Sequence, residues 1–519
     1  MPSRAAAPQR GGETDWPTAL LLGARLGKAG GVKPPDSPHA ATPLGRSMRR
    51  VGNLLITISA ITPAMSVFVI GQDVIRQAGS GAILCFTAAA LLGITTAFVY
   101  AELSSAFPLT GGEYTMIGRT MGPSWGFMAL GLNLFGGGLG QAVTALGLAD
   151  YLGVVIPGLS TPAAVLAVAL AVTVGATAVT LLNIRLNAKI TGAFLLVELA
   201  ALAVMTGLGF AHPHRSLAEL ALNPVRSVGG GLAPTPLAVI GMATAGAIYA
   251  YNGYGGACYF GEEMYEARTK VAWVICVSLV VAILAEFTPI AAALMGAPDL
   301  KAMLSDAQPL PAFLRAAGGE FADKAVSLGV AVAIINAMIA IGLINARQLY
   351  CSGRDGVWPG PLNRWMAAVH PRFHSPWIAT LVMGALTAAC CLLPLGLLIM
   401  LTGTGLVMIY AGVSLAAIWG RLNRTADVGH YRMPLFPLFP ALSLIMLVVV
   451  GAADILDPES GRPSLIVNLS VMGLSAAYYF LYLKRRGGWM LRGADGKPLE
   501  ALEAEGLAGE AEGLISAPP

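Results

Sequence analysis

The chain has 519 residues, of which 56% are hydrophobic and only 12% are charged, whereas about 25% are charged in ordinary soluble domains. Its mean hydropathy is +0.70, and 32 Lys and Arg residues against 28 Asp and Glu residues give a net charge of +4. This composition excludes a soluble globular enzyme and a disordered chain, and so mild a charge balance excludes a nucleic-acid-binding protein. The chain is therefore expected to be an integral membrane protein.

Both ends of the chain are expected to be weakly ordered tails. Residues 1–48 are rich in Pro, Gly, Ala and Arg and lack apolar periodicity, which predicts a disordered N-terminal tail. Met48 stands directly before the first apolar run, so a translation start there is an alternative to one at Met1. Residues 487–519 are rich in Gly, Glu and Ala and are predicted to form a cytoplasmic C-terminal tail.

The middle of the chain, residues 49–486, consists of repeated apolar runs. Each run is long enough to cross about 30 Å of hydrocarbon as a helix, and none alternates in the way of a barrel strand. The predicted fold is therefore all-α, with twelve transmembrane helices near residues 52–75, 81–104, 123–150, 163–183, 188–210, 236–261, 271–295, 325–346, 376–393, 395–419, 434–454 and 463–483.

The basic residues support an even number of spans with both termini in the cytoplasm. On that topology, 25 of the 32 Lys and Arg residues fall in inner segments and 7 fall in outer segments. This skew follows the positive-inside rule, and a missed span would destroy it. The chain is therefore predicted to be a multi-pass protein of the cytoplasmic (inner) membrane, with long outer connections near 211–235 and 296–324.

Two of the predicted spans contain helix-breaking residues at mid-depth. The first span has Pro63, which removes a backbone donor, and the sixth has three glycines just after Asn252, each of which weakens a helix by about 1 kcal/mol. Either break alone is explained by a kink or by a packing face of small residues. Together, at matching positions of two five-helix halves, they predict an inverted-repeat transporter with its substrate site at the midplane.

Three separated motifs resemble one family of membrane proteins. They are Tyr100 to Tyr114 (YAELSSAFPLTGGEY) with Gly122 to Phe127, Tyr251 to Glu263, and Arg347 to Pro359. Over about residues 49–485, the chain resembles the amino acid–polyamine–organocation (APC) permeases of the bacterial amino acid permease type. The resemblance implies alternating access and an amino acid or a related amine as substrate.

The same resemblance implies a LeuT-like fold, which is a five-plus-five inverted repeat with broken helices 1 and 6. The first repeat would be residues 52–210 and the second would be residues 236–419. Two extra helices would follow within residues 434–483.

The resemblance also implies a substrate site built from three helices, in which backbone amides freed at a break can hold a substrate carboxylate. One departure is that helix 1 lacks the Gly-x-Gly motif of many amino acid members, while some polyamine-type relatives carry a similar Thr-Pro segment. A polyamine or amine permease is therefore an alternative to an amino acid permease. The implied residues are Thr62, Pro63, Ala64, Met65 and Ser66 in helix 1, Gly136, Gly137 and Gln141 in helix 3, and Tyr251, Asn252, Gly253, Tyr254 and Gly255 in helix 6.

Glu198 lies in the middle of the fifth predicted span, where a charge costs at least about 2.5 kcal/mol on insertion scales. Several relatives carry Lys at what resembles this position, in the space of a sodium site. A carboxyl group in an apolar site suits proton uptake and release, so Glu198 is predicted to couple transport to protons. The alternative is a neutral Glu bonded to a neighbouring helix. Glu286, nearer the outer half of the seventh span, is expected to be a structural or a vestibule carboxyl group.

Charged residues at the inner helix ends are candidates for an inner gate. Ion pairs between them would break when the site opens toward the cytoplasm, whereas the alternative is that each caps a helix or sets the topology at the membrane surface. These residues are Glu102, Arg119, Glu262, Arg354 and Asp355.

The predicted function is secondary active transport of a small amino acid, coupled to protons, because the eighth span lacks the mid-helix Ser/Thr pair of sodium-coupled relatives. The alternatives are an amine permease, an amino acid exchanger and a nutrient sensor of the same fold. An enzyme is not expected, since the six His residues lie in the tail or loops. No catalytic residue, metal or cofactor is expected either. The expected partners are the substrate, a proton and membrane lipid, without nucleic acid, and the oligomeric state is left open.

Overall fold

The computed structural model of this chain describes residues 44, 47–156, 158–159, 161–459, 461–486 and 489–492. The predicted N-terminal tail, residues 1–48, lies almost entirely outside the described residues, and so does most of the predicted C-terminal tail. The predictions for both tails therefore stay predictions.

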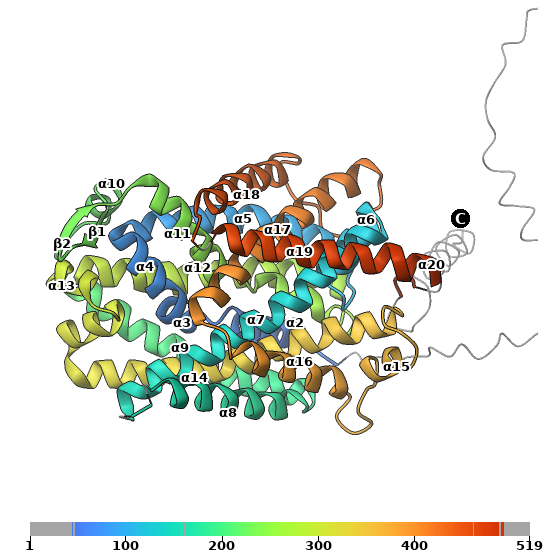
Figure 1. The fold of residues 1–519 in the computed structure, drawn as a ribbon, viewed down its shortest axis with the longest axis horizontal. Helices are drawn as coiled ribbons and strands as arrows, with labels where there is room; N and C mark the ends of the chain where they lie inside the picture. The colour runs from blue at the N-terminus through green and yellow to red at the C-terminus, as the bar shows by residue number, and fades with distance from the viewer. Residues whose placement is uncertain are drawn as a thin grey trace, which may run out of the picture. The chain divides into compact units, whose positions relative to one another are not determined.

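Helices make up most of the described residues (Figure 1). The longer ones are α2 (Arg50–Ile61), α5 (Ala82–Ala106), α7 (Pro123–Val155), α8 (Pro162–Thr180), α9 (Ile184–Ala211), α11 (Leu237–Ala250), α12 (Ala267–Gly296), α14 (Pro309–Arg354), α16 (Trp377–Cys390), α17 (Leu395–Leu422), α18 (Leu438–Leu456) and α19 (Gly461–Tyr478). The shorter ones are α3 (Pro63–Met65), η2 (Ser66–Gly71), α4 (Gln72–Ala78), η3 (Gly79–Gly81), α6 (Glu113–Met121), α10 (Leu217–Leu222), η4 (Tyr254–Phe260), α13 (Leu300–Ser305), α15 (Leu362–Met366), η5 (Tyr479–Leu483) and α20 (Lys484–Arg486).

Proline and capping residues explain where several long helices begin. Pro123 begins α7 and Pro309 begins α14, since proline at the first position loses no helical hydrogen bond. Pro162 begins α8, and the Thr161 hydroxyl caps that helix by accepting a hydrogen bond from the Ala164 amide. These proline and capping signals stand next to the helix start in the sequence, so they set where each helix begins independently of how the helices pack.

Nine helical stretches of the described residues are long and apolar enough to cross a membrane. This finding confirms a multi-pass membrane protein. The nine stretches do not correspond one to one to the twelve predicted spans. The first two predicted spans fall in one continuous stretch of 57 residues, Arg50–Ala106. The sixth and ninth contain α11 and α16, which have only 14 residues each. The number twelve therefore stays a prediction.

The all-α prediction is wrong in the connection near residues 211–235. There β1 (Val225–Val228) and β2 (Gly231–Pro234) form an antiparallel hairpin, in which Val225 pairs with Pro234. The two residues between the strands, Gly229 and Gly230, have φ angles of +57° and +78°. Such angles suit a two-residue hairpin turn and glycine adopts them at no steric cost. The hairpin was missed because its strands are short.

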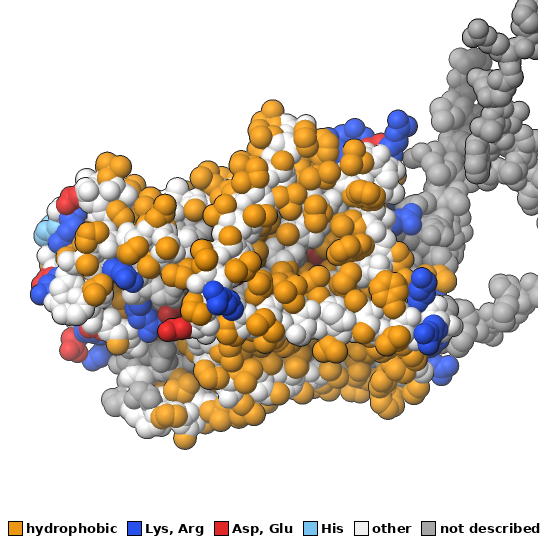
Figure 2. Space-filling model, turned by 45° about the horizontal axis from the view of Figure 1, so that its top comes forward, with side chains coloured by type: hydrophobic (Ala, Val, Ile, Leu, Met, Phe, Trp, Pro, Cys, Tyr) orange, Lys and Arg blue, Asp and Glu red, His pale blue; other side chains and the backbone are white. Residues whose placement is uncertain are grey.

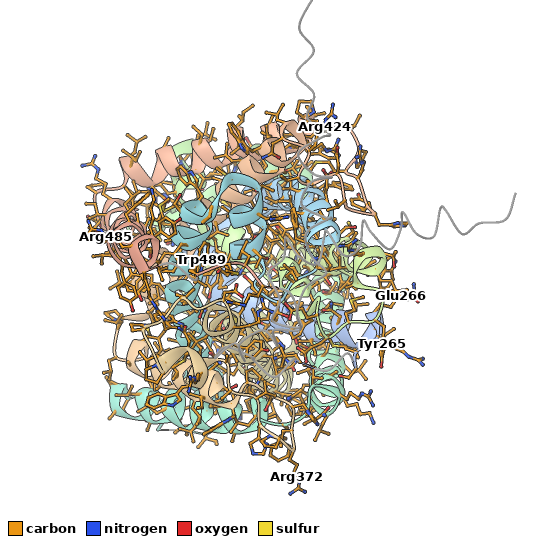
Figure 3. All side chains as sticks on the ribbon, turned by 90° about the vertical axis from the view of Figure 1, so that its right-hand side faces the viewer. Tyr265, Glu266, Arg372, Arg424, Arg485 and Trp489 are labelled. Carbon is orange, nitrogen blue, oxygen red and sulfur yellow. The ribbon has the colours of Figure 1, made fainter. Side chains whose placement is uncertain are left out.

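The connections between helices gather at two opposite ends of the helical body. Figure 1 shows α10, α13 and the hairpin at one end, and α6, α15 and α20 at the other. The first set comes from the connections predicted to be outer, and the second set from those predicted to be inner. Figure 3 views the second end face on, where Arg372, Arg424 and Arg485 point outward at its rim.

The flank between the two ends is strongly apolar. Figure 2 shows hydrophobic side chains over most of this surface, with Lys, Arg, Asp and Glu concentrated toward the ends. Large apolar side chains such as Val174, Leu196 and Leu284 are more than half exposed. A soluble monomer rarely exposes a contiguous apolar area of this kind, so this flank is expected to face lipid.

The centre of the body is a row of tightly packed helices in which α5 contacts α12, α12 contacts α9, α9 contacts α14, and α14 contacts α7. Between α9 and α12 the backbones themselves touch. A Cβ atom on Gly209 would lie 2.2 Å from the Ala292 carbonyl oxygen, and one on Gly296 would lie 2.3 Å from the Gly209 carbonyl oxygen. Glycine therefore permits this helix crossing, as small residues do in membrane bundles.

We predict that Gly209→Ala destabilises the protein by about 1–3 kcal/mol, the usual range for overpacking, because the new methyl group meets a backbone carbonyl. Gly207→Ala, on the same helix but with nothing within 4 Å of a Cβ, is the matched control and should leave stability equal or higher, since Ala favours helix. Thermal unfolding of the purified protein in detergent measures both. Equal melting temperatures for the two variants would contradict the backbone contact.

Candidate functional site

The first predicted break lies between α2 and α3. Thr62 adopts the left-handed conformation, with φ +51° and ψ +68°, and Pro63 starts α3. This conformation is uncommon for a β-branched residue such as threonine, so contacts with neighbouring residues must hold Thr62 in it. The chain continues as the π-helix η2 from Ser66, and π-helical segments are frequently found at functional sites. Helix 1 is therefore interrupted where the sequence predicted.

The second predicted break follows α11. Gly253 has a φ angle of +125° and leads into the 3-10 helix η4. A Cβ atom on Gly253 would lie 2.9 Å from both the Cα and the N of Ile61. Both the angle and the contact therefore require glycine.

The two breaks are joined by a hydroxyl group. Ser66 donates from its Oγ to the carbonyl oxygen of Ala250 at 2.9 Å and lies 3.0 Å from that of Ile61. These carbonyls are at the ends of α11 and α2, where a helix leaves its last acceptors unpaired. The breaks in helices 1 and 6 thus form one structural unit.

A cavity of about 140 Å³ lies beside this unit. One water molecule needs roughly 10–15 Å³ of such space, so the cavity is large enough for a small solute. Among its lining residues are eight that were predicted for the substrate site: Thr62, Met65, Ser66, Gly136, Gly137, Asn252, Gly253 and Gly255.

The other five predicted residues, Pro63, Ala64, Gln141, Tyr251 and Tyr254, are not among the lining residues. The Gln141 side chain joins helices instead, because its Nε2 donates to the Met338 carbonyl at 2.9 Å and its Oε1 accepts from Thr387 at 3.0 Å. The Tyr251 ring packs edge-on against Phe86, and the Tyr254 ring against Tyr100 and Tyr410. Contacts with neighbouring helices set the positions of these side chains, and the sequence motifs do not specify those contacts.

Polar groups of the lining come from several helices. The Asn252 Oδ1 accepts a hydrogen bond from the Tyr410 hydroxyl at 2.9 Å. The Asn345 Nδ2 donates to the Gly137 carbonyl at 2.9 Å, and a Cβ atom on Gly137 would lie 2.6 Å from the Asn345 Oδ1. Amide and backbone groups are thus held in place around the cavity, which suits recognition of a polar solute.

Glu113, at the start of α6, lines the cavity and was not predicted as a site residue. Its carboxyl group accepts hydrogen bonds from the Tyr100 hydroxyl at 2.8 Å, from the Asn133 amide at 3.2 Å, and from the Tyr259 hydroxyl. Burial raises the pKa of Glu113, and these hydrogen bonds oppose the rise. The signal in the sequence was a lone carboxyl in the Gly-Gly-Glu-Tyr run of the first motif.

Glu198, on α9, is fully buried and contacts the back of the first break. Its Oε1 accepts a hydrogen bond from the Ala64 amide at 2.8 Å, while its Oε2 has no hydrogen-bond partner. The side-chain amide of Asn336 on α14 is also buried, and neither its Oδ1 nor its Nδ2 has a hydrogen-bond partner. Glu198 thus holds the segment whose other residues line the cavity.

Buried ion pairs gather at the end of the body that carries α6. Arg354 lies 2.6 Å from Glu262 and 3.0 Å from Asp355, and the Glu262 Oε1 also accepts the Thr110 amide. These pairs join the segment after η4 to the end of α14. Two further pairs at this end join predicted acidic residues to arginines that were not predicted as partners. They are Arg347–Glu263 at 2.5 Å and Arg421–Glu102 at 2.6 Å.

Four of the five gate candidates therefore take part in buried or half-buried ion pairs. The fifth, Arg119, lies on α6 at the same end (Figure 1). An ion pair that only stabilises the fold has the same geometry.

Residues 51–476 match the family model for amino acid permeases. The chain belongs to the amino acid permease family. This match confirms the resemblance seen in the three sequence motifs.

Several relatives of this permease carry transporter names. An uncharacterized transporter of Mycobacterium tuberculosis is 28% identical over 403 residues, which cover 78% of this chain and 83% of the relative. The branched-chain amino acid permease of Bacillus subtilis is 22% identical over 468 residues, which cover 86% and 96%. The methylthioribose transporter of the same organism is 22% identical over 423 residues, which cover 77% and 86%. The permease is therefore a transporter and not an enzyme.

We predict that Gly136→Leu lowers the affinity for the amino acid substrate at least tenfold without lowering the melting temperature. A Cβ atom on Gly136 meets nothing within 4 Å, so a larger side chain there takes up cavity space rather than clashing. Gly175→Leu is the matched control, because Gly175 lies at an exposed position of α8 and a Cβ atom there also meets nothing within 4 Å. This variant should bind the amino acid as the unchanged protein does. Equilibrium binding of radiolabelled amino acids measures both, and undiminished binding by Gly136→Leu would place the substrate elsewhere.

Proposed function

We propose that the permease is a secondary active transporter that carries a small amino acid across the cytoplasmic (inner) membrane, with both termini in the cytoplasm. Alternating access in a twelve-helix, inverted-repeat fold would expose the cavity to one side of the membrane at a time. The observation that carries the proposal is the contact between the two helix breaks, which directs Thr62 and Gly253 toward one cavity in a member of the amino acid permease family.

The cavity lining supports an amino acid with an apolar side chain. Backbone groups at the breaks can bond the carboxylate and ammonium groups of such a substrate, and Glu113 adds a carboxyl group that favours an ammonium group. Much of the remaining lining is apolar and includes Leu132, Ile344 and Ile409. Of the substrates named for the relatives, a branched-chain amino acid fits this wall.

Proton coupling through Glu198 is supported by its hydrogen bond to the first break. An ionised carboxylate binds the Ala64 N–H more strongly than a protonated one, since charge-assisted hydrogen bonds are about twice as strong as neutral ones. Protonation would therefore loosen the segment whose Thr62, Met65 and Ser66 line the cavity. In this way a proton on Glu198 would change the shape of the substrate site.

The ion pairs near α6 would serve as the inner gate. Breaking a buried pair is costly unless both charges regain water. Opening toward the cytoplasm would supply that water to Arg354 and Glu262 at the moment they separate. The closed pairs, by contrast, would keep the cavity sealed on that side.

We predict that, in proteoliposomes, the permease accumulates L-leucine under an imposed inward proton gradient. Glu198→Gln should reduce this accumulation at least tenfold but keep leucine counterflow, because exchange needs no net proton movement. Glu219→Gln, at an exposed position of α10, is the matched control and should accumulate leucine normally.

Three results would change the proposal. Full gradient-driven accumulation by Glu198→Gln would remove this residue from coupling. Counterflow without accumulation by the unchanged permease would indicate an amino acid exchanger. Uptake of putrescine in place of every amino acid tested would indicate an amine permease.

A further inference from the structure

The η4 helix and the residues after it pack directly against the connection between α5 and α6. A Cβ atom on Gly112 would lie 2.3 Å from the Cε1 atom of the Tyr259 ring, and Gly112 has a φ angle of +55°. A Cβ atom on Gly261 would lie 2.6 Å from the carbonyl oxygen of Pro108. Glycine at both positions therefore permits a contact in which side chain or backbone meets backbone.

Glu113 fastens this contact at the cavity. Its carboxyl group accepts hydrogen bonds from Tyr259 of η4, from Tyr100 of α5 at 2.8 Å and from Asn133 of α7 at 3.2 Å. The Asn133 amide also donates to the Tyr259 hydroxyl at 3.4 Å. All four residues line the cavity. Donors from three other elements thus converge on one carboxyl group in the cavity wall.

The same contact continues away from the cavity through Glu262. This residue accepts a hydrogen bond from the Thr110 amide at 3.0 Å and pairs with Arg354 at 2.6 Å. Unlike Glu113, neither Glu262 nor Arg354 is among the described residues that line the cavity. Glu113 therefore holds the layer nearest the cavity, and the ion pair holds the layer beyond it.

These bonds give the contact two distinct states. An ionised carboxylate only accepts hydrogen bonds, and bonds to it are about twice as strong as neutral ones. Three donors on Glu113 therefore hold η4 firmly while the contact is dry. Loss of these donors in an apolar site is costly, so η4 can leave Glu113 only when water enters and replaces them. The contact is either closed and dry or open and wet.

We infer that Glu113 is a positioning residue for transport, a latch that holds η4 against α5, α6 and α7 and so closes the cavity toward the end of the body that carries α6. The inference rests on the proposed function, in which the cavity opens to one side at a time and this end faces the cytoplasm. It adds a second layer to the proposed inner gate. Solute leaving the cavity toward this end passes the latch before the ion pairs.

The test uses a cysteine in the cavity as a reporter of access. Gly136 lines the cavity, and a Cβ atom there meets nothing within 4 Å, so Gly136→Cys places a thiol in open space. A membrane-impermeant maleimide is applied without substrate to inside-out and to right-side-out membrane vesicles. The same permease without Gly136→Cys gives the background from the six native cysteines.

Glu113→Gln leaves one acceptor oxygen where the carboxylate had two, and Tyr259→Phe removes one donor. We expect each to raise the labelling rate in inside-out vesicles at least about threefold, since a hydrogen bond to a charged group shifts an equilibrium by at least this factor. The rate in right-side-out vesicles should fall at the same time. If Glu113→Gln fails to fold, Tyr259→Phe, which loses only a hydroxyl group, decides the test.

Tyr265→Phe is the matched control. It loses the same hydroxyl group later in the same segment, at an exposed position toward the rim of the end that Figure 3 views face on. Both labelling rates should stay unchanged in this variant. Unchanged rates in Tyr259→Phe overturn the inference. A rise of equal size from both sides also overturns it, because a general loosening of the fold has that effect whereas a latch acts on one side.

The labelling result is separate from the proposed function, since it needs neither substrate nor transport. If the unchanged permease accumulates no leucine, the proposed function fails, while a one-sided shift of labelling still supports the latch. If the permease accumulates leucine and the shift is absent, the latch fails and the proposed function stands.

Discussion

The contact between the two helix breaks is the constraint on which the rest of the site depends. Gly253 lies directly against the backbone of Ile61, and the Ser66 hydroxyl bonds the carbonyl oxygen of Ala250. A continuous helix at either position would have its backbone groups paired internally. Because both helices are interrupted at the same depth and pressed together, polar backbone lies inside an apolar body, where it is tolerated only if it lines a cavity or is buried in protein.

Two groups of buried acidic residues differ in their partners. Glu262, Glu263 and Glu102 are paired with arginines at one end of the body, where they hold helices together. Glu198 and Glu286 are buried without a hydrogen bond to a cationic side chain among the described residues. Uptake of a proton removes the charge of such a carboxyl group without a protein countercharge, so the partners of each acid suggest its task.

Local features of the fold were predictable, whereas contacts between distant segments were not. Thr62–Pro63 and the glycines after Asn252 interrupt helices through their own backbone chemistry, so the sequence located both breaks. The role of Gln141 as a link between helices depends on α14 and α16, and the position of Glu113 in the cavity depends in part on Tyr259 of η4. All three elements lie far from these residues in the chain. The hairpin escaped because two short strands and a Gly-Gly turn carry little periodic signal.

Equilibrium binding of L-leucine to Gly253→Ala tests the central claim most directly. The added methyl group would press on the Ile61 backbone and would need a φ angle near +125°. Gly241→Ala, on α11 with only an ordinary 3.8 Å contact to Ala453, serves as its control. The account predicts that Gly253→Ala binds leucine at least tenfold more weakly and that Gly241→Ala binds it normally. Equal leucine affinity for Gly253→Ala and the unchanged permease would show that the contact between the breaks does not shape the substrate site.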